Sequence, residues 1–129
     1  MAILFIAVAI KFIRIECKIP AFTATFLITN LLFTCVAEEA FFRGFIQERL
    51  IHLFSSFRFS QLITVLCSAV LFGIAHMGGG SIYTILAMLT GLGYAYSYAV
   101  VRRIEAPILI HFLFNATHFI FFTYPKIQY

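Results

Sequence analysis

Three ionisable side chains interrupt a hydrophobic stretch of the chain. Glu38, Glu39 and Arg43 follow a 17-residue run without charge, residues 21–37, and more phenylalanine and isoleucine comes after them. A charge near the centre of a bilayer costs about 2.5 to 3.5 kcal/mol on insertion scales, and such residues usually face a bundle interior or a wet cavity. These three side chains are therefore the first candidates for chemistry.

Helical spacing divides this cluster into two parts. Glu39 and Arg43 are four residues apart in the favourable order for an ion pair, whereas Glu38 is rotated by about 100° from Glu39. We expect Arg43 to neutralise Glu39, which leaves Glu38 less compensated. A carboxylate of that kind beside a histidine is suited to activating water as a general base.

More polar side chains occur in the later hydrophobic segments. Phe72 and His76 are four residues apart, so the ring of Phe72 can pack one turn below the imidazole and fix its orientation. His111, Asn115 and His118 stand at i, i+4 and i+7, which places all three on one helical face. Taken alone, such residues are more often hydrogen-bonding partners between helices than catalytic groups.

The composition indicates that these segments lie in a membrane. Of the 129 residues, 63% are hydrophobic and only 11% are charged, and the mean hydropathy is +1.03. At roughly 20 apolar residues per span, this length allows four or five spans, and lipid requires each to satisfy its own backbone groups. We expect an all-α, polytopic transmembrane helical bundle with four to five membrane helices, in a single membrane-embedded domain over residues 1–129. This makes it an integral, multi-pass membrane protein, in the plasma membrane if the source is prokaryotic.

Charged residues, prolines and glycines divide the chain into the helices of this bundle. Residues 1–13 supply about half to two-thirds of a span, and a charged cluster follows them. With residues 1–13 counted as the first helix, the remaining hydrophobic segments predict a second to a fifth, over residues 21–54, 61–77, 82–101 and from Pro107 onward.

Two serines and a repeat of small residues predict finer features of these helices. Ser60 and Ser81 suit the N-cap positions of the third and fourth helices. Gly91, Ala95 and Ala99 recur every four residues on one face of the fourth helix, and we expect this face to pack tightly on a neighbour.

Distances along the helices test whether the polar residues can meet. Glu38 and His76 each lie 16 residues from the turn of the second and third helices, so antiparallel packing would place both about 24 Å from its tip. His111 is only four residues, about 6 Å, beyond Pro107 on the same side. It reaches their level only if the hairpin projects past the membrane surface, and the charged segment 48–58 suits such a projection.

Three motifs together are similar to those of a known family. Glu-Glu-x-x-x-Arg from Glu38, Phe-x-x-x-His ending at His76 and His-x-x-x-Asn from His111 occur in this order on successive hydrophobic helices. Over about residues 33–117, the chain resembles the CPBP or Abi family of intramembrane proteases. That family includes CAAX prenyl proteases and bacteriocin-processing or self-immunity proteins.

The resemblance implies a glutamate-dependent intramembrane endopeptidase that needs no metal or other cofactor. In such an enzyme Glu38 and His76 would activate water. His111 and Asn115 would stabilise the oxyanion, as preorganised donors do in a dry site. His118 lies outside the family pattern, and we assign it no catalytic role. The supporting residues are Glu39, Arg43 and Phe72.

The resemblance also implies partners. They are the lipid bilayer and a peptide or protein substrate, which can be lipidated: prenylated CAAX tails, bacteriocin leaders and membrane-anchor peptides all suit the family. Family members usually have more membrane helices than 129 residues supply. A fragment, a minimal member and a homo-oligomer are therefore all compatible with this chain.

Two other functions stay open. Glutamate and histidine are good zinc ligands, so a zinc-dependent intramembrane protease is one alternative. Against it, no His-Glu-x-x-His is present, and His52, the histidine nearest to the carboxylates, lies in a charged turn. The other is a non-catalytic membrane protein, either a bacteriocin self-immunity partner or a proton or solute path lined by Glu38 and His76.

The positions of the charged residues and the cysteines argue against two further classes of function. The net charge of +4 comes from Lys and Arg at the ends of hydrophobic runs, which indicates membrane flanks, and we expect no nucleic-acid partner. Cys17, Cys35 and Cys67 are widely spaced, so neither a disulfide framework nor a thiolate metal site is indicated.

Overall fold

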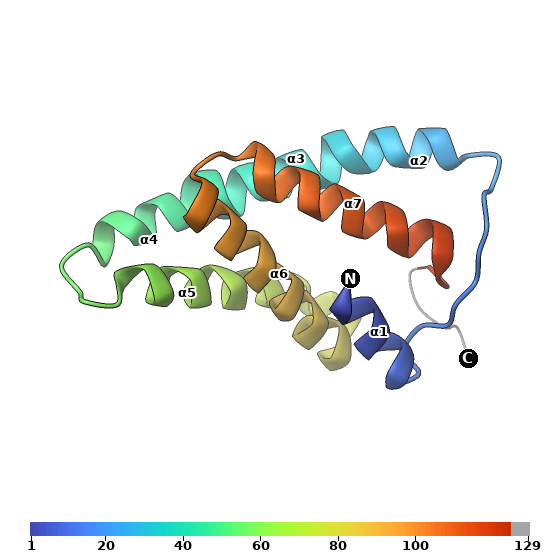
Figure 1. The fold of residues 1–129 in the computed structure, drawn as a ribbon, viewed down its shortest axis with the longest axis horizontal. Helices are drawn as coiled ribbons and strands as arrows, with labels where there is room; N and C mark the ends of the chain where they lie inside the picture. The colour runs from blue at the N-terminus through green and yellow to red at the C-terminus, as the bar shows by residue number, and fades with distance from the viewer. Residues whose placement is uncertain (125–129) are drawn as a thin grey trace.

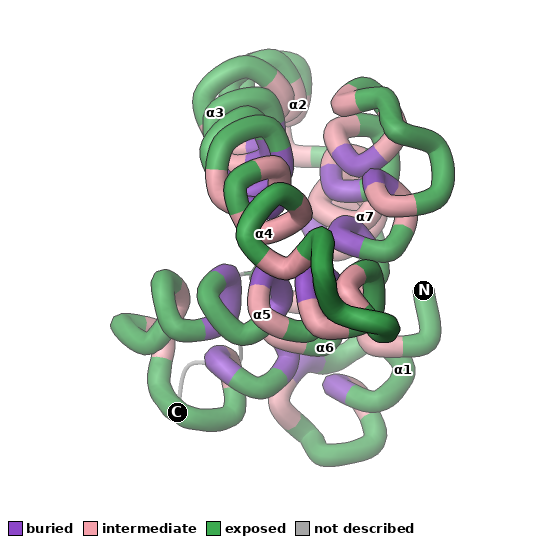
Figure 2. The backbone as a smooth tube through the Cα atoms, turned by 90° about the vertical axis from the view of Figure 1, so that its left-hand side faces the viewer, coloured by how far each residue is buried: buried purple, intermediate pink, exposed green. Residues whose placement is uncertain are grey.

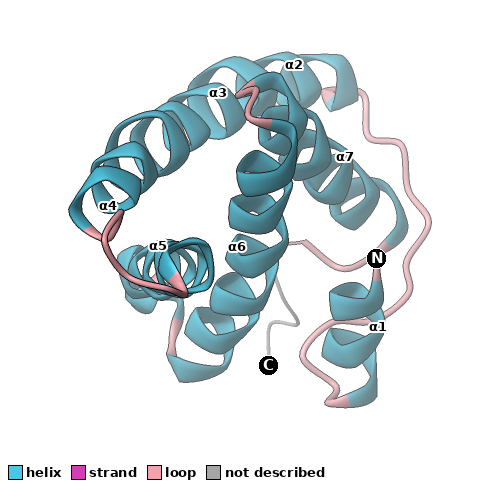
Figure 3. Cartoon of the chain, turned by 60° about the vertical axis from the view of Figure 1, so that its left-hand side comes forward, coloured by secondary structure: helices cyan, strands magenta, loops and turns pink. Residues whose placement is uncertain are grey.

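The computed structural model describes residues 1–124, and all the regular elements in this range are helices (Figure 1 and Figure 3). The all-α expectation is therefore confirmed. In chain order the elements are α1 (Ala2–Ala9), α2 (Thr23–Thr29), η1 (Asn30–Cys35), α3 (Val36–Glu39), η2 (Ala40–Gln47), α4 (Glu48–Leu53), α5 (Ser60–Ala75), η3 (Met77–Gly79), α6 (Ser81–Val101) and α7 (Glu105–Phe121).

The elements from α2 to α4 form one continuous helix, Thr23–Leu53, of 31 residues. It agrees with the predicted helix over residues 21–54 to within two residues at either end. Two stretches of it, η1 and η2, have π-helical hydrogen bonding, which is often found at functional sites. They lie on either side of α3, the short α-helical segment that carries Glu38 and Glu39.

The remaining long helices pack against this one in sequence. α5 returns beside η2 and α4, α6 lies against α5, and α7 lies along η1 and α3 (Figure 1). The turn between α4 and α5 projects past the turn between α6 and α7 (Figure 1). This is the projection that His111 requires if it is to reach the level of Glu38.

Two helices within residues 1–124 are long and apolar enough to cross a membrane, namely Thr23–Leu53 and Ser81–Val101. On length and composition, this is fewer than the four to five membrane helices expected. α5 has 16 residues and α7 has 17. The third helix is shorter than predicted because α5 already ends at Ala75, ahead of the three consecutive glycines from Gly78.

The first hydrophobic segment forms a short helix rather than a span. α1 has eight residues, about 12 Å, against a hydrocarbon core of about 30 Å. Lys11 then adopts a φ of 58°, and the chain folds back, so that the N–H of Phe12 donates to the carbonyl of Ala7 at 2.8 Å. α1 packs through Leu4 and Ala7 against Leu86 of α6.

A short extended pairing holds α1 against the end of α7. The backbone N–H of Glu16 donates to the carbonyl of Phe121 at 2.9 Å, and the N–H of Thr123 donates to the carbonyl of Arg14, also at 2.9 Å. Between these two bonds, Ile15 forms an isolated antiparallel bridge with Phe122. Residues near the two ends of the described chain therefore lie side by side.

The predicted serine caps are wrong. Ser60 and Ser81 are the first residues of α5 and α6, and neither makes a side-chain capping hydrogen bond. Phe59 and Gly80 occupy the N-cap positions instead. Gly80 has a φ of 92°, a conformation that glycine adopts without the steric cost of a side chain, so the chain turns at the glycine.

The small-residue face of α6 packs closely, as expected. Gly91 and Ala95 are buried, and their backbone carbonyls accept hydrogen bonds from a neighbouring helix. Nη2 of Arg43 donates to Gly91 at 2.8 Å, and Nε2 of Gln47 donates to Ala95 at 2.9 Å. Without larger side chains in the way, two polar groups of the long helix reach the backbone of α6.

Buried residues face the interior of the bundle, and the outward faces are mostly exposed (Figure 2). Many of the exposed side chains are large and apolar, which is typical of a surface that contacts membrane or another protein. Examples are Phe33, Phe41, Leu62, Tyr96 and Leu109.

The packing of Gly91 predicts the outcome of a paired substitution. A Cβ atom at Gly91 would lie 2.9 Å from Cδ1 and 3.1 Å from Cβ of Phe72, whereas one at Gly93 would meet nothing within 4 Å. We expect Gly91→Leu to lower the free energy of unfolding by about 1 to 3 kcal/mol. Gly93→Leu, the control on the same helix, should leave it unchanged or slightly raised. Unfolding in detergent measures both, and equal effects of the two variants would contradict the packing described.

Candidate functional site

The polar residues singled out in the sequence border one cavity of about 180 Å³. Glu38 comes from α3, His76 from the residue after α5, and His111 and Asn115 from α7. The depth of His111 is compatible with this meeting because the α4–α5 turn projects outward (Figure 1). The structure therefore brings together all four of these side chains.

Glu38 and His76 face each other across part of this cavity. Oε2 of Glu38 lies 3.8 Å from Nε2 of His76, and no residue in the described part of the chain donates a hydrogen bond to this buried oxygen. Nδ1 of His76 lies 2.7 Å from the carbonyl oxygen of Phe72. Because a carbonyl only accepts, Nδ1 carries a proton and Nε2 is the nitrogen presented to Glu38.

The ring of Phe72 fixes the position of His76, as their spacing predicted. The two ring centroids are 4.5 Å apart. The guanidinium carbon of Arg43 lies 4.7 Å from the centre of the Phe72 ring, a cation–π contact. Phe72 thus lies between the histidine of the cavity and the buried charges of the long helix.

Glu39 is the centre of a buried polar cluster. One oxygen forms the expected ion pair with Nε of Arg43 at 3.0 Å, and the other lies 2.8 Å from Nδ1 of His111. Glu39 and Arg43 are completely buried, and His111 is 4% exposed. The contact with His111 was not predicted. It means that the neighbouring glutamates differ in environment: Glu39 is enclosed by partners, whereas Glu38 faces the cavity.

Tyr94 is a site residue that was not predicted. Its ring stacks on the imidazole of His111, with centroids 4.6 Å apart and planes 15° apart. It also lines the cavity and is buried. A tyrosine in an apolar helix carries no signal of this role, because the contact depends on how α6 packs against α7.

Asn30 is a second unpredicted residue. Its side-chain oxygen lies 3.3 Å from Nδ2 of Asn115 and 3.3 Å from Sγ of Cys35, and it lines the same cavity. One feature of the sequence could have pointed to it: Asn30 is the one carboxamide in the charge-free run of residues 21–37.

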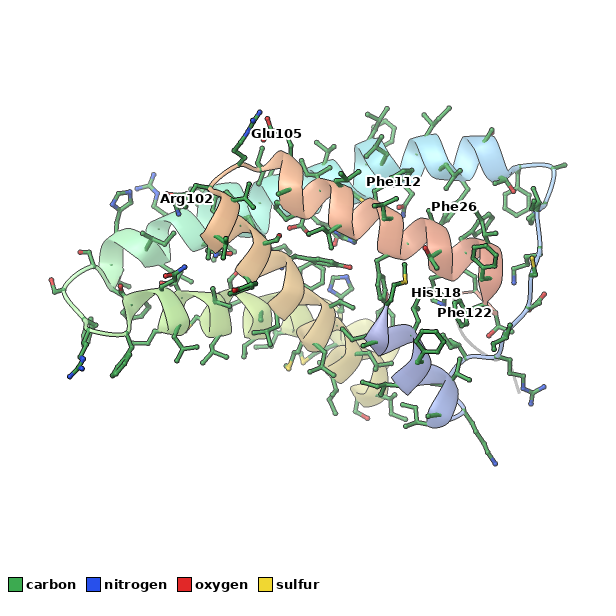
Figure 4. The ribbon with its side chains drawn as sticks, viewed as in Figure 1. Phe26, Arg102, Glu105, Phe112, His118 and Phe122 are labelled. Atoms are coloured by element: carbon green, nitrogen blue, oxygen red, sulfur yellow. The ribbon has the colours of Figure 1, made fainter. Side chains whose placement is uncertain are left out.

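His118 lies on the same face of α7 and also lines the cavity. Its Nε2 is 3.1 Å from the backbone carbonyl of Thr123, so it contacts the segment that follows α7. Figure 4 shows His118 near Phe26 and Phe122, at the opposite end of α7 from Arg102 and Glu105. The expectation that it has no catalytic role stays a prediction.

The cavity wall also has an apolar part. It comes from α1, from the residues after α1, and from α6 and α7. The apolar lining residues include Leu4, Ala7, Ile13, Leu86 and Phe114. A ligand with one polar and one apolar part would fit this division.

Residues 1–124 contain no group of three or more His, Cys, Asp or Glu side chains arranged to hold a metal ion.

Comparison with known proteins places the chain in a family. Residues 20–117 match the profile of the type II CAAX prenyl endopeptidases, described as Rce1-like. The matched range begins after α1 and ends within α7, so it contains Glu38, His76, His111 and Asn115. No curated protein and no solved structure matches the chain.

The buried cluster predicts a strong effect of removing Arg43. Arg43→Met would leave Glu39 buried with only His111 as partner, and breaking a buried pair typically costs about 3 to 5 kcal/mol. We expect a loss of this size in the free energy of unfolding in detergent micelles. Arg49→Met, the control at an exposed position of the same helix, should change it by less than about 0.5 kcal/mol. Similar stability of the two variants would show that the Glu39–Arg43 pair does not hold the fold.

Proposed function

Because the chain belongs to the Rce1-like family of type II CAAX prenyl endopeptidases, we propose that it is an intramembrane endopeptidase of glutamate type. Glu38 and His76 activate a water molecule, and His111 and Asn115 stabilise the oxyanion. The observation that carries the proposal is that Glu38 and His76 face each other in the cavity that His111 and Asn115 also line.

The separation of Glu38 and His76 suits one water molecule between them. A water about 2.8 Å from both atoms fits across the 3.8 Å from Oε2 to Nε2. It would donate one hydrogen to each, which directs its lone pairs away from both. With Nδ1 of His76 bonded to a carbonyl, Nε2 is free to accept. Glu38 and His76 together would therefore orient the water as well as deprotonate it.

The reaction steps follow from this placement. The water oxygen bonds to the carbonyl carbon of the peptide while Glu38 takes one of its protons. The carbonyl oxygen becomes an oxyanion, and donors from His111 and Asn115 stabilise it. Collapse of the intermediate breaks the C–N bond, and the proton on Glu38 passes to the leaving amine. Water and peptide are then converted to a carboxyl and an amine product.

Glu39 supports the proposed role of His111. With Nδ1 of His111 directed at the Glu39 carboxylate at 2.8 Å, Nε2 is left for the cavity. In the imidazolium form both nitrogens carry protons, so His111 would donate to Glu39 and to the oxyanion at once. The stacked ring of Tyr94 keeps the imidazole plane fixed during this step.

The shape of the cavity supports a substrate with a lipid part. A prenylated peptide tail, the substrate class in the family's description, would place its scissile bond beside Glu38 and His76 and its apolar chain against lining residues such as Leu4 and Leu86. The apolar outer surface of the bundle also supports a substrate that reaches the protein from within the membrane.

We propose that α5 and α7 cross the membrane together with the two longer helices, giving four spans in one domain. Their 16 and 17 residues would span about 24 to 26 Å, which a modest local thinning of the bilayer accommodates. The α4–α5 and α6–α7 turns would then lie on one side and the glycine loop after α5 on the other (Figure 1).

Cysteine labelling tests this arrangement. In a variant without the three native cysteines, single cysteines at Ser56, Arg103 and Gly78 occupy exposed positions in the three turns. We expect a membrane-impermeant maleimide to label Ser56→Cys and Arg103→Cys from the same side of sealed vesicles. Gly78→Cys should react only from the other side. Labelling of all three from one side would contradict four spans.

Peptide cleavage by the purified protein in detergent tests the activity. We expect cleavage of a farnesylated peptide with a C-terminal CAAX sequence, and a loss of roughly 10²- to 10⁴-fold in kcat for Glu38→Gln and for His76→Ala. Glu105→Gln, the control at the exposed glutamate that begins α7 (Figure 4), should retain full activity. All variants should keep their helical circular dichroism spectrum.

The same assay separates the competing functions. Cleavage that survives Glu38→Gln would remove the proposed base. Inhibition by chelators that zinc reverses would move the assignment to a metalloprotease. No cleavage, together with full biological function of the Glu38→Gln variant, would favour a non-catalytic membrane protein.

A further inference from the structure

We infer that Asn30 is a positioning residue for the oxyanion site. Its side-chain oxygen holds the amide of Asn115 so that one N–H of Asn115 stays directed at the reacting carbonyl oxygen. The inference rests on the proposed function, since it gives Asn30 a role only through Asn115.

The contacts of Asn30 place its oxygen between two donors. Nδ2 of Asn115 donates to Oδ1 of Asn30 at 3.3 Å, and the thiol of Cys35 donates to the same oxygen at 3.3 Å. Asn30 is 6% exposed and Cys35 is completely buried. Two donors on one oxygen fix the plane of the Asn30 side chain, and this fixed oxygen in turn fixes Asn115.

The hydrogens of Asn115 are divided by this arrangement. Its Nδ2 lies 3.3 Å from Oδ1 of Asn30 and 3.8 Å from Sγ of Cys35, and these two acceptors are themselves 3.3 Å apart. One N–H can therefore serve both as a three-centre hydrogen bond. The second N–H of Asn115 is left for an oxygen in the cavity, which is what an oxyanion donor requires.

The local helix geometry explains how Asn30 and Cys35 meet. In an α-helix, residues five apart point about 140° away from each other. These two residues begin and end η1, the segment with π-helical i to i+5 hydrogen bonding. The wider turn brings their side chains to one face, and that face is turned toward α7. The π-helical segment therefore has a specific consequence at the site.

A purely structural role for Asn30 makes a different prediction. If the hydrogen bond to Asn115 only held α7 against η1, its loss would lower the free energy of unfolding, and any loss of kcat would follow that loss of stability. If Asn30 acts by orienting Asn115, kcat should fall while the folded protein keeps its stability and KM, and only while Asn115 is present. Measuring the free energy of unfolding beside kcat and KM in a double-mutant cycle separates the two.

The experiment measures kcat and KM for a farnesylated CAAX peptide in detergent. Asn30→Leu keeps the side-chain size and removes the acceptor, and Asn30→Ala provides a second variant in case the first folds poorly. We expect either to lower kcat roughly 10- to 100-fold with little change in KM, because a misplaced donor weakens the transition state. In the Asn115→Ala background, itself reduced about 10²- to 10³-fold, the further loss should be less than about twofold.

Thr29→Ala is the matched control, since Thr29 precedes Asn30, is exposed, and its hydroxyl donates to carbonyls of its own helix. It should leave kcat unchanged. Equal losses in both backgrounds, or full activity of the Asn30 variants while Asn115→Ala is impaired, would overturn the role of Asn30 alone. Full activity of Asn115→Ala would overturn the proposed oxyanion role of Asn115, and the role of Asn30 with it.

Discussion

The fold depends on one buried carboxylate. Glu39 is enclosed by Arg43 from its own helix and by His111 from α7, with contacts of 3.0 and 2.8 Å. Arg43 continues the connection to α6 through the carbonyl of Gly91 at 2.8 Å. A single negative charge therefore links three helices. Removing charge from water inside such a bundle is costly, so each of these groups is tolerated only because the others are present.

This constraint gives two adjacent glutamates different environments. A rotation of about 100° per residue turns Glu39 toward the interior and Glu38 toward the cavity. Glu39 is completely buried, whereas the side chain of Glu38 is 29% exposed. Oε2 of Glu38 accepts no hydrogen bond from the described residues. The first residue keeps its partners through the proposed reaction, and the second is free to exchange a proton.

Much of this arrangement could be predicted from local sequence. Hydropathy and the glycine and proline breaks located the long helices, and four-residue spacing predicted the Glu39–Arg43 pair and the Phe72–His76 contact. The contacts of His111 with Glu39 and of Asn115 with Asn30 join residues 72 and 85 positions apart, so no local pattern reports them. The π-helical turns also change which side chains share a face. On length, two helices reach the size of a full span where four to five were expected, because α5 and α7 have only 16 and 17 residues. The first hydrophobic segment forms the short α1, which packs on α6.

The two hydrogen bonds from the long helix to α6 restrict the motions open to the molecule. Arg43 and Gln47 are one turn apart, and so are the carbonyls of Gly91 and Ala95 that accept from them. Sliding either helix along its axis by less than a full turn, about 5.4 Å, would break both bonds without replacing them. These two helices therefore resist axial translation as one unit. α1 and α7, which also line the cavity, are not held by these two bonds.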